Sequence, residues 1–242
     1  MNSKLRFTLV LIAALVATAA IKEIPAWSSA AQQQTAPTTQ SGNAQTTPAV
    51  DIWGDDFNSE TLDQTKWERF TFQGGSGGKF EIKDGQLRQR SVAGTRAGVR
   101  SKKVWRTDRF YVEATLAKVG QAMPEPGQGG LPIGNAIVTV LFDGAGANRL
   151  EWMLTSEGTF EAWAVVDGRG ERLDNRRLGT KSKNPRLGIA RRSDEIYFML
   201  NGEIGLQKTI KNLPQTFTVM LYGFGSSEND WDSVIVQSPK GS

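Results

Sequence analysis

The sequence predicts an all-β fold in which two antiparallel sheets pack face to face. Three observations lead to this fold class. Apolar and polar residues alternate along many short segments, which is typical of strands with one buried face. Turn-forming pairs such as Asp84-Gly85 and Asn201-Gly202 separate these segments, and no stretch has the roughly 3.6-residue apolar period of an amphipathic helix. Because a sheet with one apolar face must bury that face against another layer, we expect a two-sheet β-sandwich.

The first 30 residues have the pattern of an export signal. A basic start is followed by an apolar run over 7–21 and then by small residues. The run has fifteen residues, fewer than the about 20 that span a bilayer as a helix. We therefore expect a signal peptide over 1–30, cleaved after Ala30 or, at an earlier site, after Ala19. Its cleavage leaves a secreted, periplasmic or cell-envelope protein without membrane insertion, and the alternative is a retained N-terminal anchor.

Residues 31–50 contain no charged and no aromatic side chain and are rich in Gln, Thr, Ala and Pro. Such a segment cannot bury enough apolar surface to offset the entropy lost on ordering, so we expect a flexible linker, with a coil draped on the domain as the alternative. From Asp51 onward the composition changes, and 51–238 is expected to be one β domain. The absence of cysteine excludes disulfides and lipid attachment to a lipobox, so the core alone must hold this domain.

The alternation predicts about eleven to thirteen short strands within the domain. They comprise a segment over 51–57, a hairpin over 79–90, strands over 98–104, 110–119 and 136–142, a hairpin over 149–166, a strand over 186–191, a hairpin over 194–206, and strands over 216–223 and 231–237. The Gly- and Pro-rich segment 120–134 is expected to be a long loop, a type of segment that often has a function. The tryptophans assigned to the core or to strand edges are Trp53, Trp67, Trp105, Trp152 and Trp231.

The hairpin over 149–166 is the strongest candidate for a working surface. If its loop consists of residues 156–158, Met153 pairs with Glu161 and Glu151 pairs with Trp163. These four side chains then share the outward face. The core side receives Leu150, Trp152, Leu154 and Phe160.

The charge distribution argues against a general polyanion-binding protein. The chain has a formal net charge of +4, and removal of residues 1–30, which carry +2, leaves only +2. The basic residues are concentrated between Arg169 and Arg192, a segment interpreted as a solvated loop. The alternative is a site for acidic glycans, surface polymers or nucleic acid. No aromatic residue lies within this segment, which argues against stacking of single-stranded nucleic acid.

A succession of motifs along 51–238 resembles the concanavalin A-like lectin/glucanase superfamily. The motifs are Asp55-Asp56-Phe57 with Leu62-Asp63 and Trp67, Phe80-x-Ile82-x-Asp84-Gly85-x-Leu87, Phe110-x-Val112-Glu113-Ala114, Ile196-x-Phe198-x-Leu200-Asn201-Gly202-Glu203 and Trp231-Asp232-x-Val234-x-Val236. Their order and spacing are similar to those of laminin G-like and family 16 glycosidase-like jelly rolls. The resemblance implies a jelly roll that either binds or cleaves glycans, and fold analogy does not decide between these activities.

Catalytic residues are not carried over from that resemblance. Family 16 hydrolases have a Glu-x-Asp-x-Glu or Glu-x-Asp-x-x-Glu strand, whereas this chain has Glu151, Glu157 and Glu161 without a central Asp. The absence of His and Cys excludes a Ser-His-Asp triad, a cysteine nucleophile and an ordinary zinc site. A separate carboxylate pair, Glu151 and Glu161, remains as an alternative. As diagonal neighbours they would lie roughly 7–8 Å apart, within the roughly 6.5–9.5 Å of an inverting glycosidase.

An outward tryptophan indicates sugar binding more directly than either glutamate does. Sugar-binding sites stack the apolar faces of pyranoses on such rings, while nearby polar groups bind the hydroxyls. The expected ligand-binding residues are therefore Trp163, Glu151, Glu161 and Met153, and the alternative is that segment 120–134 covers Trp163. We expect an exported lectin-like domain whose partner is a polysaccharide or other glycan, with no nucleic acid. The alternatives are a glycoside hydrolase or lyase and an envelope domain that binds protein.

No cofactor is expected, apart from one alternative. Asp55, Asp56 and Asp232 could meet where the first and last strands come together and hold a structural Ca²⁺, since oxygen ligands suit that ion. The other interpretation of these carboxylates is a hydrogen-bonded turn.

Overall fold

The computed structural model describes residues 49–72, 77–92, 95–122, 133–177, 182–225 and 227–242. The expected signal peptide 1–30 and nearly all of the expected linker 31–50 lie outside these residues, and so does most of segment 120–134. No helix in the described ranges is long and apolar enough to cross a bilayer.

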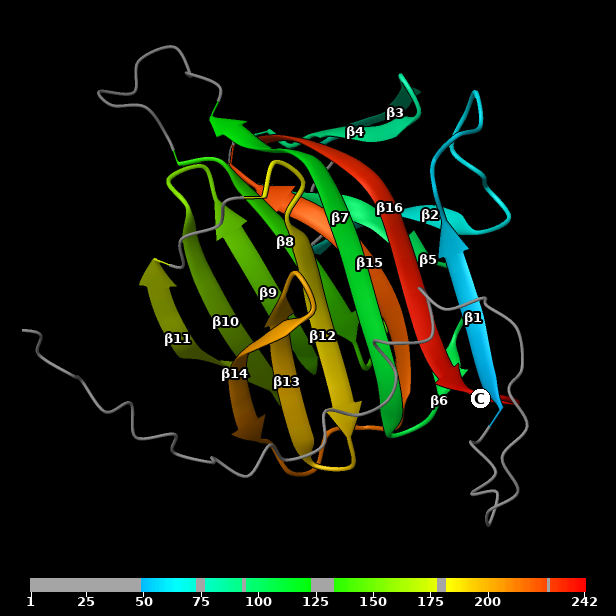
Figure 1. Ribbon diagram of the computed structural model, residues 1–242, viewed down its shortest axis with the longest axis vertical. Helices are drawn as coiled ribbons and strands as arrows, with labels where there is room; N and C mark the ends of the chain where they lie inside the picture. Colours follow the sequence, from blue (N-terminus) through cyan, green and yellow to red (C-terminus); the bar gives the residue numbers. More distant parts are fainter. Residues whose placement is uncertain (1–48, 73–76, 93–94, 123–132, 178–181, 226) are drawn as a thin grey trace, which may run out of the picture. The chain divides into compact units, whose positions relative to one another are not determined.

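Within the described ranges the chain forms sixteen strands and no α-helix (Figure 1). Their bounds are β1 Val50–Asp55, β2 Trp67–Thr71, β3 Lys79–Lys83, β4 Gln86–Arg90, β5 Arg96–Ser101, β6 Trp105–Arg106, β7 Arg109–Ala122, β8 Asn135–Leu141, β9 Arg149–Thr155, β10 Thr159–Val166, β11 Arg169–Arg177, β12 Arg186–Arg192, β13 Glu195–Leu200, β14 Glu203–Thr209, β15 Thr216–Phe224 and β16 Ser227–Pro239.

The strands form two antiparallel sheets. Sheet A has the order β14-β13-β12-β7-β16-β4-β3, and β1 also pairs with β16. Sheet B has the order β11-β10-β9-β8-β15-β5-β2, and β6 also pairs with β15. Neighbours within a sheet are often far apart in the sequence, for example β16 beside β4 and β15 beside β5. The predicted all-β sandwich of two antiparallel sheets is confirmed.

The core lies between the two sheets and contains one face of nearly every strand. Trp67, Trp105, Trp152 and Trp231 are fully buried, and Trp53 is partly buried with its ring 5.3 Å from those of Trp67 and Trp105. The prediction that these five tryptophans are core or edge residues is thus confirmed. The indole Nε1 of Trp152, on β9 of sheet B, donates to the carbonyl oxygen of Met199, on β13 of sheet A, at 2.8 Å. One side chain therefore links the two layers.

The predicted hairpins over 79–90 and 194–206 are both present. Asp84 and Gly85 connect β3 to β4 with φ values of 55° and 72°, and Asn201 and Gly202 connect β13 to β14 with 54° and 85°. Positive φ at both central residues is the conformation that these residue pairs tolerate best. Here the local sequence determined the turn and hence the register.

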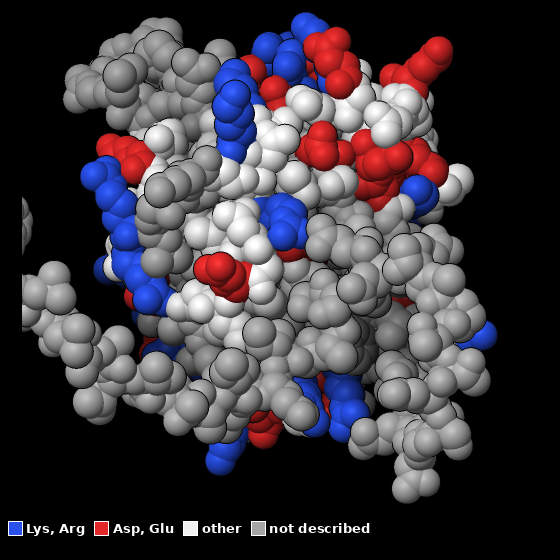
Figure 2. All heavy atoms as spheres, viewed as in Figure 1, with Lys and Arg blue, Asp and Glu red and all other residues white. Residues whose placement is uncertain are grey.

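The prediction that the basic segment beginning at Arg169 is a loop is wrong over residues 169–177, which form strand β11. This strand pairs with β10 and is the edge of sheet B, where most of its residues are exposed on both faces. No apolar alternation marks it because neither of its faces is fully buried. Lys and Arg side chains gather along the left rim of Figure 2, where β11 lies in Figure 1.

The prediction of a loop over 120–134 is wrong for its first residues, 120–122, which belong to strand β7. Strand β7 continues through Ala122, where its backbone still pairs with β16. Strands β2, β6 and β11 were not expected, which explains why sixteen strands exceed the predicted count.

Candidate functional site

The hairpin of β9 and β10 has the predicted register. Met153 lies opposite Glu161, and Glu151 lies opposite Trp163. Leu150, Trp152, Leu154 and Phe160 point into the core and are at most 1% exposed. Glu151, Met153, Glu161 and Trp163 consequently lie together on the face of sheet B that points away from the core, which we call the outer face of sheet B.

These four side chains line a pocket of about 220 Å³ on that face. The pocket also contains Arg149 from the same hairpin and residues that are distant in the sequence, namely Arg96 on β5 and Tyr222 and Phe224 on β15. It therefore extends across strands β10, β9, β8, β15 and β5. We refer to it as the outer-face pocket.

Glu151 is buried in the outer-face pocket, with 6% exposure. Its Oε1 accepts hydrogen bonds from the hydroxyl of Tyr222 at 2.7 Å and from Nε of Arg149 at 2.5 Å. Burial and the negative charge of Glu151 raise the pKa of Tyr222 well above its ordinary value. The phenol therefore remains a proton donor, and the carboxylate of Glu151 is held between a hydroxyl and a guanidinium.

Glu161 and Trp163 form a second polar group, nearer the edge strand β11. The indole Nε1 of Trp163 donates to Oε2 of Glu161 at 2.9 Å, and Nδ2 of Asn175 donates to Oε1 of the same carboxylate at 3.2 Å. The guanidinium of Arg172 lies 3.9 Å from Glu161 and 5.8 Å from the centre of the Trp163 ring. Trp163 is half-buried, so part of its ring remains accessible in the described structure.

Aromatic side chains at the end of β2 cover the middle of the outer face of sheet B. The ring of Phe72 lies 5.2 Å from that of Phe70 and 5.4 Å from that of Tyr222, and the Arg149 guanidinium lies 5.0 Å from it. These rings pack on an apolar cluster separate from the core, which includes Ile137, Leu141, Met153 and Met220. Tyr222 belongs to this cluster and also lines the outer-face pocket, so the aromatic residues beside β2 pack against one of the pocket's walls.

Solved structures share this arrangement of two sheets at low sequence identity. An endo-β-1,3-glucanase from Pyrococcus furiosus is 13% identical, with a TM-score of 0.60 over 77% of this chain and 93% of its own. A GlcNAcα1-4Gal-releasing endo-β-galactosidase from Clostridium perfringens is 13% identical, with a TM-score of 0.59 over 84% and 66% of the two chains. A β-glucanase from Bacillus licheniformis is 12% identical, with a TM-score of 0.54 over 76% and 97%. No family model and no curated protein sequence matches this chain.

The fold is the concanavalin A-like jelly roll. The resemblance of the sequence motifs to this superfamily is thereby confirmed for the fold. Identities of 11–13% show a shared fold and do not show a shared active site, so the chemistry of the site must be argued from the residues present.

Within this jelly roll, strand β9 does not place a set of carboxylates on the outer face. Its outward positions are Arg149, Glu151, Met153 and Thr155, so the two positions after Glu151 are a thioether and a hydroxyl. Glu157 lies in the exposed turn between β9 and β10. The outer face of β9 therefore has no Asp beside Glu151, in agreement with the missing central Asp of the sequence motif. The arrangement offers a ring for stacking and several hydrogen-bonding groups.

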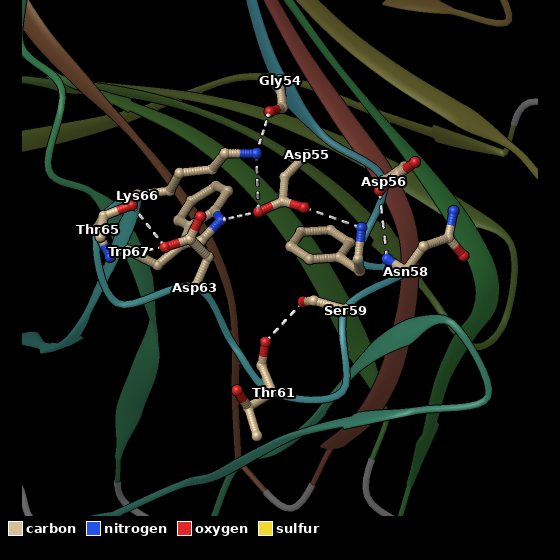
Figure 3. A network of polar contacts seen from close by, with 11 residues as sticks. Gly54, Asp55, Asp56, Asn58, Ser59, Thr61, Asp63, Thr65, Lys66 and Trp67 are labelled. Atoms are coloured by element: carbon tan, nitrogen blue, oxygen red, sulfur yellow. Dashed lines mark hydrogen bonds and ion pairs between the residues drawn. The ribbon is translucent and has the colours of Figure 1, made fainter.

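The three aspartates considered for Ca²⁺ are not gathered by the jelly roll into one site. Asp55 accepts hydrogen bonds from the backbone N–H of Phe57 at 3.0 Å and from Nε1 of Trp67 at 2.8 Å, and Lys66 lies 3.7 Å away (Figure 3). Asp56 instead accepts a hydrogen bond from the backbone N–H of Asn58 at 3.3 Å. Asp232 lies on β16, where Asp55 pairs with Val234. Across the described ranges, no group of three or more Asp, Glu, His or Cys side chains could hold a metal ion.

Sequence reasoning did not identify the rest of the outer-face pocket. Arg96, Tyr222 and Phe224 reach it because β15 lies beside β8 in sheet B and β5 lies beside β15. The outward alternation of Met220, Tyr222 and Phe224 along β15 was a usable signal for one face of a strand. The neighbours of that strand in the sheet could not be read from the sequence, because they depend on long-range pairing.

Proposed function

We propose that this chain is a carbohydrate-binding, lectin-like domain that binds a glycan in the outer-face pocket without cleaving it. The observation that carries the proposal is the accessible ring of Trp163 in a pocket whose other walls present a carboxylate, a guanidinium and further aromatic rings. Aromatic rings beside hydrogen-bonding groups match the alternating apolar faces and hydroxyls of a pyranose. The same-fold structures named as glucanases and as an endo-β-galactosidase support a carbohydrate as the class of ligand.

Binding without cleavage is supported by the burial and the hydrogen bonds of Glu151. A general acid must present a proton to the leaving oxygen. Glu151 instead accepts hydrogen bonds from the hydroxyl of Tyr222 and from Nε of Arg149, and it is almost fully buried. Glu161 is likewise held by Trp163 and Asn175. Neither carboxylate is placed as a free acid or base, although both lie on one face as a hydrolase or lyase would require.

A glycan array followed by calorimetry of its hits tests the binding site. Trp163→Ala removes the stacking ring and should weaken binding at least tenfold, which corresponds to about 1.4 kcal/mol. Tyr197→Ala is the matched control, because Tyr197 is a half-buried aromatic residue on sheet A. An array without any glycan hit would contradict the proposal and favour an envelope domain that binds protein. Equal affinity of the wild type and Trp163→Ala would move the site away from this pocket.

Assays of reducing-end release separate binding from hydrolysis. We expect no release from the glycans that bind, and we expect Glu151→Gln to change affinity only modestly, since the amide keeps a hydrogen-bonding oxygen. In a hydrolase the same substitution would lower the rate by roughly 10²–10⁴. Release of sugar by the wild type that disappears in Glu151→Gln or Glu161→Gln would establish the alternative function.

Export is part of the same proposal, because the protein must leave the cytoplasm to bind an extracellular or envelope glycan. Mass spectrometry of the native protein should find the N-terminus at Ala31, or at Ala20 if the earlier site is used. An intact Met1 in the membrane fraction would instead show a retained anchor.

A further inference from the structure

The carboxylates of the outer-face pocket each have an arginine partner. Glu151 is paired with Arg149 at 2.5 Å, and the side chains of both residues are less than 15% exposed. Glu161 lies 3.9 Å from the guanidinium of Arg172. The negative charges of the pocket are therefore balanced within the protein, and neither of them requires a cation from the ligand.

Arg96 is a further cation in the wall of the same pocket. It is exposed at the start of β5, opposite Phe224 of β15 in the sheet, and its guanidinium lies 5.6 Å from the centre of the Phe224 ring. Among the residues that the structure describes, no carboxylate forms an ion pair with it. The ring contact holds the side chain beside the pocket while its N–H groups remain available.

The position of Arg96 relative to Trp163 defines two ends of the pocket. Trp163 lies on β10, whereas Arg96 lies on β5, and strands β9, β8 and β15 separate them in sheet B. The volume of about 220 Å³ is below the roughly 300–1,000 Å³ of sites for drug-sized ligands, so it suits a short part of a glycan. A sugar that stacks on Trp163 would extend its substituents, or the next sugar, toward Arg96.

We infer that the glycan bound in this pocket is acidic, and that Arg96 binds its anionic group. This inference rests on the proposed function and adds the class of sugar to it. A guanidinium donates two parallel, charge-assisted hydrogen bonds to a uronic acid carboxylate or to a sulfate ester, whereas a neutral sugar hydroxyl carries no charge to pair with it. The pocket thus combines a stacking ring for the sugar with an unpaired cation for its charge.

The experiment uses a glycan array that contains neutral, carboxylated and sulfated sugars, probed with the purified protein and four variants. Arg96→Gln removes the charge, Arg96→Lys keeps the charge but loses the planar fork, and Trp163→Ala removes the stacking ring. Arg192→Gln is the matched control, because Arg192 is an exposed arginine on β12 of sheet A. Hits are then compared with neutral counterparts of the same backbone, in which the carboxylates are esterified or the sulfates removed, at two salt concentrations.

We expect the wild type to prefer acidic glycans over their neutral counterparts by about tenfold at low salt, with a smaller preference at high salt because exposed charges are screened. Arg96→Gln should abolish this preference, Arg96→Lys should keep part of it, and Arg192→Gln should leave it unchanged. Carboxylated or sulfated hits identify the source of the charge.

Three outcomes would overturn the inference, and they are distinguishable from each other. If only neutral glycans bind and Trp163→Ala abolishes their binding, the acidic class is wrong while the proposed function stands. If acidic glycans bind but Arg96→Gln keeps the preference, the charge is recognised elsewhere, for example on β11. If no glycan of any class binds, both the inference and the proposed function fail.

Discussion

At the scale of single residues, the buried carboxylate of Glu151 depends on the phenol of Tyr222. Burial raises the pKa of Tyr222, so the hydroxyl remains protonated and donates to Glu151 at neutral pH. Tyr222→Phe removes this donor and leaves the carboxylate with Arg149 as its side-chain partner. We expect the free energy of unfolding to fall by about 1–3 kcal/mol, measured by urea denaturation. Tyr197→Phe, on sheet A, is the control, and an unchanged midpoint for Tyr222→Phe would show that Glu151 does not need the phenol.

Asp143 makes stability depend on pH. Burial alone would raise the pKa of Asp143, but hydrogen bonds from the backbone N–H groups of Ala147 and Asn148 outweigh it and lower the pKa below the ordinary 3.8. Because the folded state favours the charged carboxylate, its contribution is present above about pH 4 and is lost as the pH falls through the lowered pKa.

The corresponding variant is Asp143→Ala. At pH 7 it should lower the free energy of unfolding by about 1–2 kcal/mol, since three N–H groups lose a charged acceptor. The difference from the wild type should shrink in urea titrations below pH 4. A difference in the free energy of unfolding that stays constant from pH 7 to pH 3 would contradict the stabilising role of the Asp143 carboxylate.

At the scale of elements, two hairpin turns contain a glycine with positive φ, and they differ in whether an added Cβ would also clash with a neighbouring side chain. Gly85, between β3 and β4, and Gly158, between β9 and β10, have φ values of +72° and +76°. A Cβ at Gly158 would meet nothing within 4 Å, whereas one at Gly85 would lie 2.8 Å from Oδ1 of Asn58. Gly158→Ala should therefore destabilise the fold by about 1–2 kcal/mol through strain alone. Gly85→Ala should destabilise it further in thermal unfolding, and equal effects would show that Asn58 moves aside freely.

The elements also show what could be predicted from the sequence. The register of Met153 with Glu161 and of Glu151 with Trp163 was predictable, because a short turn and an apolar alternation together determine it. Strand β11 was not, since an exposed edge strand carries no apolar alternation. Arg96 and Tyr222 could not be assigned to the pocket, because their positions depend on the pairing of β15 with β5 and β8.

At the scale of the whole molecule, Trp152 packs between the two sheets and contacts residues of both. It is fully buried, its ring centre is 5.4 Å from that of Phe160 and 5.5 Å from that of Phe198, and its indole N–H reaches Met199 on the other sheet. The chain has no disulfide to compensate for lost packing. Trp152→Ala should therefore lower the free energy of unfolding by about 3–5 kcal/mol in urea titrations.

The comparison variant for the core is Trp163→Ala. Trp163 is half-buried on the outer face of sheet B, so its removal should affect stability far less than the removal of Trp152. A loss below about 1 kcal/mol for Trp152→Ala would mean that the faces of the hairpin are reversed.

The charged edge strand β11 has a consequence for how copies of this protein behave toward each other. An edge strand leaves backbone N–H and C=O groups unpaired, and a flat apolar edge invites a strand of another molecule to add to it. Charges of both signs alternate along β11, at Arg169, Glu171, Arg172, Asp174, Arg176 and Arg177. The side chain of Arg176 also bonds the carbonyl of Gly205 on β14, which joins this edge to an edge of sheet A. Desolvating such an edge is unfavourable, so the strand protects the protein from edge-to-edge polymerisation at high concentration.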